Sequence, residues 1–143
     1  MRLGGSILLG LLLLSAPAIG APNSAREAAE AFGVAVTSSD LKQLRSVLPE
    51  QGRVRLKLVH LGPEDGQFSA SQVEAILKDF LANGSVDGFE IVRVEGDDRN
   101  YGMVVGRAAL VDRSGRPRRV ALLLSFQPEA GRWVLREIKE AEE

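Results

Sequence analysis

The clearest hydrophobic pattern in the chain lies between Ser69 and Gly84. Apolar side chains recur there at the i, i+3, i+4, i+7, i+8 spacing of a one-sided helix, namely Val73, Ile76, Leu77, Phe80 and Leu81. Ser69 and Gln72 fit a capping box at its start. Ser71 and Glu74 fit the same motif two residues later. Gly84 is expected to end this helix in the left-handed conformation, so the pattern predicts a well-terminated helix with one buried face.

Two further helical patterns precede this helix. Ser24 opens the first, and Glu27 stands where a capping box requires an acid. Its apolar face consists of Ala25, Ala28, Ala29, Phe32, Ala35 and Val36. Gly33 makes the second half of this helix less certain, because glycine costs roughly 1 kcal/mol in a helix interior. A short helix after Asp40 is expected to end before Pro49, since the residue preceding a proline avoids helical backbone.

Alternation of apolar and polar side chains predicts five strands. The first runs from Arg53 to Leu61, with Val54, Leu56 and Leu58 on its buried side. The other four follow Gly84 and span Phe89 to Glu95, Tyr101 to Asp112, Arg119 to Gln127 and Arg132 to Lys139. Short turns between these four indicate antiparallel hairpins. Residues 62–66 are expected to form a loop, and the acidic end, 140–143, to be frayed.

The order of elements is therefore α-α-β-α-β-β-β-β, which indicates an α+β domain with a curved antiparallel sheet packed on the N-terminal helices. It resembles the nuclear-transport-factor-2-like superfamily, also called the cystatin-like roll, and within it a family of small exported bacterial domains of unknown function. The segments that carry the resemblance are VRLKL at 54–58, FSASQVEAILKDFL at 68–81, Phe89, Ile91, GRAALV at 106–111 and WVLREIK at 133–139. The resemblance implies a cone-shaped fold and export, and it transfers no active site.

The first twenty residues have the pattern of a signal peptide. Arg2 is followed by the apolar run 3–14 and then by small residues. That run is shorter than the roughly 20 residues that a membrane-spanning helix requires. We expect cleavage after Gly20, or after Ala18 as second choice. A single domain, 21–143, would then reach the periplasm or the exterior, and only the uncleaved signal peptide would enter a membrane.

The composition excludes several classes of function. The chain of 143 residues has no cysteine, which excludes a lipidated N-terminal cysteine, a disulfide framework, a thiol nucleophile and a cysteine zinc site. With one histidine as well, we expect no metal and no cofactor. The formal net charge of −1 creates no field that favours nucleic acid. The sequence also lacks a phosphate-binding glycine loop, a dinucleotide fingerprint and a hydrolase nucleophile elbow.

The expected interior of the cone is the first candidate site, because apolar cavities with few polar groups are common ligand sites. Its candidate lining residues are Phe32, Val36, His60, Phe80, Tyr101, Leu122 and Leu124. We therefore expect a non-catalytic binding domain for a small apolar ligand. The alternative is a cavity enzyme of the isomerase or dehydratase type, which the resemblance suggests, using His60, Tyr101 and an unidentified carboxylate. The sequence spacing supplies no such carboxylate, because Asp112 and Glu129 fall in predicted turns.

Two surfaces are further candidates. The predicted hairpin RSGRPRR carries Arg113, Arg116, Arg118 and Arg119, which could contact a phosphate or an anionic surface polymer. A solvated hairpin end is the simpler interpretation of these arginines. The exposed face of the sheet could bind another envelope protein or pair with a second copy of the chain. The resemblance is the only reason to expect such a homodimer.

Overall fold

The computed structural model describes residues 22–62, 64–96 and 99–142. The predicted signal peptide, 1–20, and its cleavage site lie outside the described residues. The helices are α2 (Ala25–Ser38), α3 (Leu41–Arg45) and α4 (Ala70–Asn83). The strands are β1 (Val54–Lys57), β2 (Asp65–Phe68), β3 (Ser85–Glu95), β4 (Gly102–Val111), β5 (Pro117–Glu129) and β6 (Arg132–Glu142).

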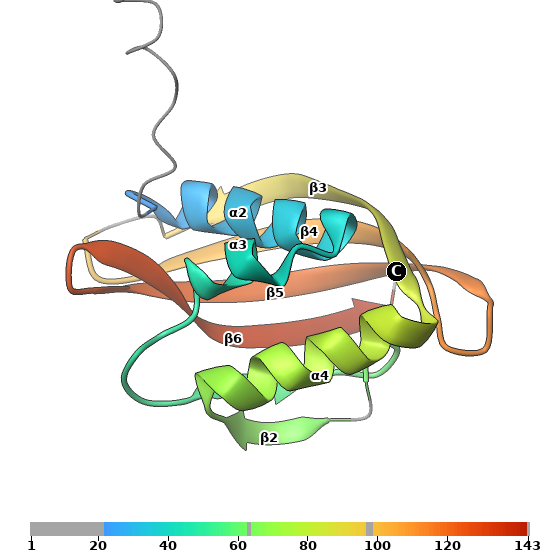
Figure 1. The fold of residues 1–143 in the computed structure, drawn as a ribbon. Helices are drawn as coiled ribbons and strands as arrows, with labels where there is room; N and C mark the ends of the chain where they lie inside the picture. Colours follow the sequence, from blue (N-terminus) through green and yellow to red (C-terminus); the bar gives the residue numbers. More distant parts are fainter. Residues whose placement is uncertain (1–21, 63, 97–98, 143) are drawn as a thin grey trace, which may run out of the picture.

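The six strands form one curved sheet in the order β2-β1-β6-β5-β4-β3. All neighbours are antiparallel except β1 and β6, which run parallel. Figure 1 shows α2, α3 and α4 on one face of this sheet. The predicted α+β architecture is therefore confirmed. Among the described residues, no helix is both long and apolar enough to span a bilayer.

The hydrophobic core fills the space between the helices and the concave face of the sheet. Its largest fully buried side chains include Phe32, Phe80, Phe126, Leu56, Leu77, Leu122 and Leu124. They come from α2, α4, β1 and β5, and they belong to one continuous apolar cluster. Burial of each such side chain contributes on the order of 1.5–3 kcal/mol, so this cluster is the main source of stability.

The organising helix, α4, begins as predicted and ends differently. The Gln72 amide donates to Ser69 Oγ over 3.3 Å, and the Ser69 amide donates to Gln72 Oε1 over 2.8 Å, which confirms the first capping box. Gly84, however, has φ −139° and ψ −173°, which is extended and not left-handed. Glycine is required there for space, because a Cβ would lie 2.6 Å from the Val111 carbonyl oxygen and 3.0 Å from the Phe80 ring.

Helix α2 continues through Gly33, where the sequence made its second half doubtful. The Phe89 ring of β3 packs directly against this glycine, and a Cβ on Gly33 would lie 2.5 Å from Phe89 Cδ2. A Cβ on Gly106 of β4 would lie 2.6 Å from the same ring. Phe89 also meets Phe32 edge to face, with ring centroids 5.9 Å apart. Gly33 and Gly106 therefore leave the space that the Phe89 ring occupies between α2 and the sheet.

Several boundaries differ from the sequence prediction, and β3, for example, begins at Ser85 and not at Phe89. The first strand ends at Lys57 and not at Leu61, and residues 58–61 turn. Within the predicted loop 62–66, a short strand begins at Asp65 and pairs with β1. The acidic end is not frayed at Glu140, because β6 continues to Glu142. The Glu140 side chain, described below, binds the turn after β1 and so connects the end of β1 with the end of β6.

Candidate functional site

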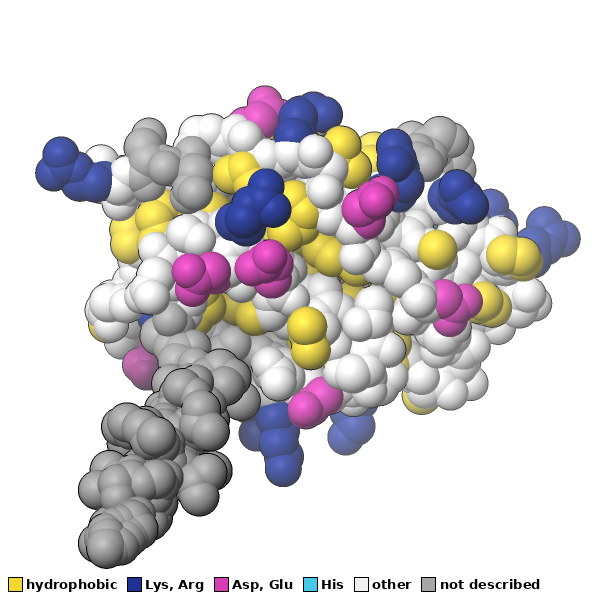
Figure 2. All heavy atoms as spheres, turned by 90° about the horizontal axis from the view of Figure 1, so that it is seen from above, with side chains coloured by type: hydrophobic (Ala, Val, Ile, Leu, Met, Phe, Trp, Pro, Cys, Tyr) yellow, Lys and Arg dark blue, Asp and Glu magenta, His cyan; other side chains and the backbone are white. Residues whose placement is uncertain are grey.

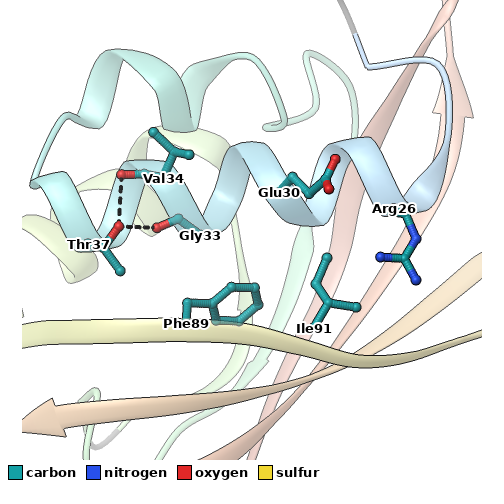
Figure 3. Close-up of a pocket in the computed structure, with 7 residues that line it drawn as sticks. All are labelled: Arg26, Glu30, Gly33, Val34, Thr37, Phe89 and Ile91. Atoms are coloured by element: carbon teal, nitrogen blue, oxygen red, sulfur yellow. Dashed lines mark hydrogen bonds between the residues drawn. The ribbon is translucent and has the colours of Figure 1, made fainter.

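An open groove runs between α2 and β3, and we call it the α2–β3 groove. Its lining residues are Arg26, Glu30, Gly33, Val34 and Thr37 of α2, with Phe89 and Ile91 of β3. Its volume is about 430 Å³. Figure 3 shows Phe89 and Ile91 rising from the strand towards the helix. The groove thus has an apolar floor and a helical wall.

The apolar part of the groove exists because Gly33 has no side chain. Phe89 lies across that position, and Ile91 follows on the same face of β3. Val34 is 49% exposed on the helix wall. The Thr37 hydroxyl donates to the Gly33 carbonyl oxygen over 2.7 Å, so the helix backbone already accepts its proton. A ligand in this groove would therefore meet the carbon atoms of Val34, Phe89 and Ile91 beside polar atoms of the helix wall.

Charged side chains stand at the N-terminal end of the same wall. Arg26 and Glu30 both line the groove, one helical turn apart on α2. Neither side chain forms an ion pair with a residue in the described part of the chain. Figure 2 views the molecule from above and shows hydrophobic surface across the middle of this face, with charged side chains around it. The groove can therefore offer a ligand an apolar surface, a cation and an anion.

The predicted cavity residues of the cone form the core and do not surround a hollow. Phe32, Val36, Phe80, Leu122 and Leu124 are each at most 3% exposed and belong to the same packed cluster. Neither the α2–β3 groove nor the pocket that contains His60 is lined by any of these five side chains. The physical reason is size, since the large aromatic and leucine side chains of both layers occupy the space between helices and sheet. These five candidate lining residues are therefore core residues in the structure.

His60 and Tyr101 do not meet. Tyr101 directly precedes β4 and is 40% exposed, with its hydroxyl 3.3 Å from Ser125 Oγ. His60 is half-buried in the turn after β1, and it lines a pocket with Asp112 and Arg113, which directly follow β4. The ten residues of β4 therefore separate the two sites. At about 3.3 Å per residue, that separation is on the order of 30 Å. The two side chains cannot act on the same atom of a substrate.

The four hairpin arginines do not converge on one point either. Arg113 pairs with Asp79 of α4 over 2.6 Å, and Arg118 pairs with Asp112 over 2.7 Å. The side chains of Arg116 and Arg119 form no ion pair with a carboxylate in the ranges that the structure describes. Only Arg113 shares a pocket with His60. The structure thus brings together His60 and Arg113, which no sequence pattern connects.

Asp112 organises the hairpin turn. Its Oδ1 accepts hydrogen bonds from the Ser114 hydroxyl over 2.6 Å, from the Ser114 amide over 2.9 Å and from the Arg116 amide over 3.0 Å. The Ser114 hydroxyl and the Arg118 guanidinium, followed by the Arg116 amide, hold the pKa of the Asp112 carboxyl well below its usual range. The turn acid is therefore an ionised structural ligand of the backbone.

Glu140 plays the corresponding part for the turn after β1, and sequence analysis missed it. Glu140 is only 5% exposed. Its carboxylate accepts hydrogen bonds from the consecutive backbone N–H groups of Val59, His60 and Leu61 over 2.8–3.0 Å. One signal could have found it. Alternation continued from Ile138 places Glu140 on the core side of β6, where a carboxylate must have partners.

Comparison with solved structures shows which fold this is. A DUF4783 family protein from Bacteroides uniformis is 14% identical, with a TM-score of 0.63, over 80% of this chain and 95% of that chain. A putative calcium/calmodulin-dependent protein kinase type II association domain from Thiobacillus denitrificans is 16% identical, with a TM-score of 0.67, over 87% and 98%. An LEH-like epoxide hydrolase from M. tuberculosis is 13% identical, with a TM-score of 0.61, over 87% and 83%.

Sequence comparisons add no closer relative. No protein-family model matches the chain, and no curated protein matches it. Identities of 13–16% establish a common fold and nothing about activity. The chain therefore has the nuclear-transport-factor-2-like fold, as its resemblance to domains of unknown function in that superfamily implied.

Proposed function

We propose that this protein is a binding domain that acts after export and holds its ligand in the α2–β3 groove. The observation that supports this most is a groove of about 430 Å³ that combines apolar Val34, Phe89 and Ile91 with Arg26 and Glu30. These two charged side chains form no ion pair with another described residue. A suitable ligand has an apolar body, which would contact Val34, Phe89 and Ile91, and at least one charged group. The groove replaces the cone interior as the proposed ligand site, because the interior is filled.

The enzymatic alternative has support from the fold alone. Two proteins with similar structures are an LEH-like epoxide hydrolase from M. tuberculosis and a putative isomerase from Rhodopseudomonas palustris. For the present chain, that alternative required His60 and Tyr101 at one substrate. Their positions beyond opposite ends of β4 argue against it. Binding without chemistry is therefore the function that we favour.

A fluorescent probe with an apolar body and an anionic group, anilinonaphthalene sulfonate, tests the proposal. Val34→Ser should weaken its binding several-fold, because the probe loses apolar contact in the groove. Val92→Ser is the matched control, since Val92 is also an exposed valine, at 44%, and lines neither the groove nor the pocket that contains His60. Equal losses in both variants, or none in Val34→Ser, would overturn the proposed site.

Export and self-association are separate parts of the proposal. We propose that the chain is cleaved after Gly20 and works outside the cytoplasm, either as a single copy or paired through the exposed face of the sheet. Native mass spectrometry of the protein purified from an exporting cell measures both properties. A mass beginning at Ala21 supports cleavage, whereas an intact Met1 contradicts it. A dimer mass supports pairing, and a monomer at micromolar concentration argues against it.

A further inference from the structure

Two loops face each other across a second pocket, at the end of the sheet where β4 finishes. The turn 58–62 follows β1, and the turn 112–116 connects β4 with β5. The pocket between them is lined by Val59, His60, Gly62, Asp112, Arg113 and Ser114 and has a volume of about 360 Å³. It lies on different elements from the α2–β3 groove and shares no residue with it.

Each wall of this pocket is fixed by a buried carboxylate. Glu140 accepts three consecutive amides of the first loop, and Asp112 accepts two amides and a hydroxyl of the second. Both acids are less than a tenth exposed. Short loops usually need no such groups, because water can satisfy their backbone. Walls held in this way keep their geometry when a ligand arrives, which is the usual requirement of a binding site.

Two side chains that can donate hydrogen bonds to an anion, Arg113 and His60, lie on the walls of this pocket. Arg113 is oriented by its 2.6 Å ion pair with Asp79, which occupies one part of a guanidinium that has five N–H donors. His60 lies on the opposite wall. The negative charge of Asp112 is offset by Arg118 at 2.7 Å. The group best matched to such a site is an oxyanion, since guanidinium binds carboxylate and phosphate oxygens in a forked geometry.

We propose that this pocket binds the carboxylate or phosphate group of a small organic anion, through Arg113 and His60. The pocket is larger than one oxyanion, and exposed Val59 supplies an apolar contact for the rest of the ligand. Glu64 is not a lining residue but lies beside Gly62, which is one, and a Cβ on that glycine would be 3.2 Å from Glu64 Oε1. The negative charge of Glu64 repels an incoming anion, so it lowers the affinity of the pocket for that anion.

Nuclear magnetic resonance titration of the isotope-labelled protein, at constant ionic strength, tests the site with two probes, inorganic phosphate and acetate. Saturable shifts of the amides in 59–62 and 113–114 are expected. The probe that saturates at lower concentration identifies whether a phosphate or a carboxylate is the better ligand. Shifts that grow linearly without saturation for both probes would overturn the proposal.

Four variants separate this site from general attraction to a basic hairpin. Arg113→Gln should weaken binding about tenfold or more, because a charged hydrogen bond to the ligand is lost. Arg116 is on the same hairpin but outside the pocket, so the affinity of Arg116→Gln should stay within about twofold of the parent. If only long-range attraction mattered, Arg116→Gln and Arg113→Gln would weaken binding equally, because each removes one positive charge. Glu64→Gln should tighten binding. Equal effects of Arg113→Gln and Arg116→Gln would overturn the proposal.

His60→Gln, on the other loop, keeps the test valid if Arg113→Gln disturbs the hairpin. It should also weaken binding, and unchanged amide shifts in β5 would show that the fold is intact. Unchanged affinity in both His60→Gln and Arg113→Gln would mean that the pocket does not bind the anion.

Discussion

Aromatic side chains lie both in the interior of the cone and at the α2–β3 groove, but the interior is packed and the groove is open. Inside, Phe32, Phe80 and Phe126 meet leucines from the sheet and close the space completely. At the α2–β3 groove, Phe89 lies against Gly33, and no larger side chain covers it from the helix. In the second pocket, buried carboxylates and not apolar packing hold the walls. A hollow therefore arises where side chains are missing or where polar groups replace packing.

The strongest way to test this contrast is to remove a side chain from the interior. Phe126→Ala should lower the free energy of unfolding by about 3–5 kcal/mol, because the loss of burial adds to the cost of a cavity. Val34→Ala in the groove should change it by less than about 0.5 kcal/mol. Urea denaturation measures both. A cost of several kcal/mol for Val34→Ala would show that the groove is part of the core.

Filling the space at Gly33 tests the groove itself. Gly33→Ala improves helix propensity by about 1 kcal/mol, but its Cβ would overlap the Phe89 ring, and overpacking usually costs about 1–3 kcal/mol. We expect a net loss of stability. Gly88→Ala is the control, because a Cβ there meets nothing within 4 Å. A Gly33→Ala variant more stable than the parent would mean that Phe89 moves aside easily.

The carboxylate that holds the turn after β1 gives a third test. Glu140→Gln removes the negative charge and replaces one carboxylate oxygen with an NH2 group, which cannot accept a hydrogen bond from a backbone amide, so it should cost about 1–3 kcal/mol. Hydrogen exchange at Val59, His60 and Leu61 should accelerate more than exchange in β5. Glu137→Gln, a more exposed acid on the same strand, should cost little. Unaltered exchange in Glu140→Gln would show that the turn after β1 is stable without the Glu140 carboxylate.

The smallest expected effect concerns Asp112 and pH. Its folded pKa is depressed, so its contribution to stability is present above the unfolded value of about 4 and is lost as the pH falls below that value. Asp112→Asn removes this dependence. The parent should therefore lose more stability than Asp112→Asn between pH 5 and pH 3 in urea denaturation. Parallel losses in the two proteins would mean that other acids carry the whole effect.

Sequence analysis predicted the fold well because periodicity reports which side chains are buried. Val73, Leu77 and Phe80 of α4, and Val54 and Leu56 of β1, are buried as expected. It failed at Asp65–Phe68, a strand with no apolar alternation, which forms because β1 offers it a hydrogen-bonding edge.

The candidate sites could not be predicted from periodicity in the same way. The alternation of apolar side chains shows that a residue points inwards, but it does not distinguish a cavity wall from a packed core. It therefore predicts Leu122 and Leu124 as lining residues, although both lie in the core cluster. The pocket with His60 and Arg113 joins two turns that are more than fifty positions apart in the chain. Only the parallel pairing of β1 with β6, which brings Glu140 under the turn 58–61, places them together.

The position of β6 has a consequence for how the chain becomes folded. β6 lies in the sheet between β1 and β5, and its Glu140 side chain binds the turn after β1. Without β6, β1 and β2 have no neighbour in the sheet that connects them to the other strands. The two parts of the sheet therefore join only through contacts that are distant in sequence, and such contacts are slow to close.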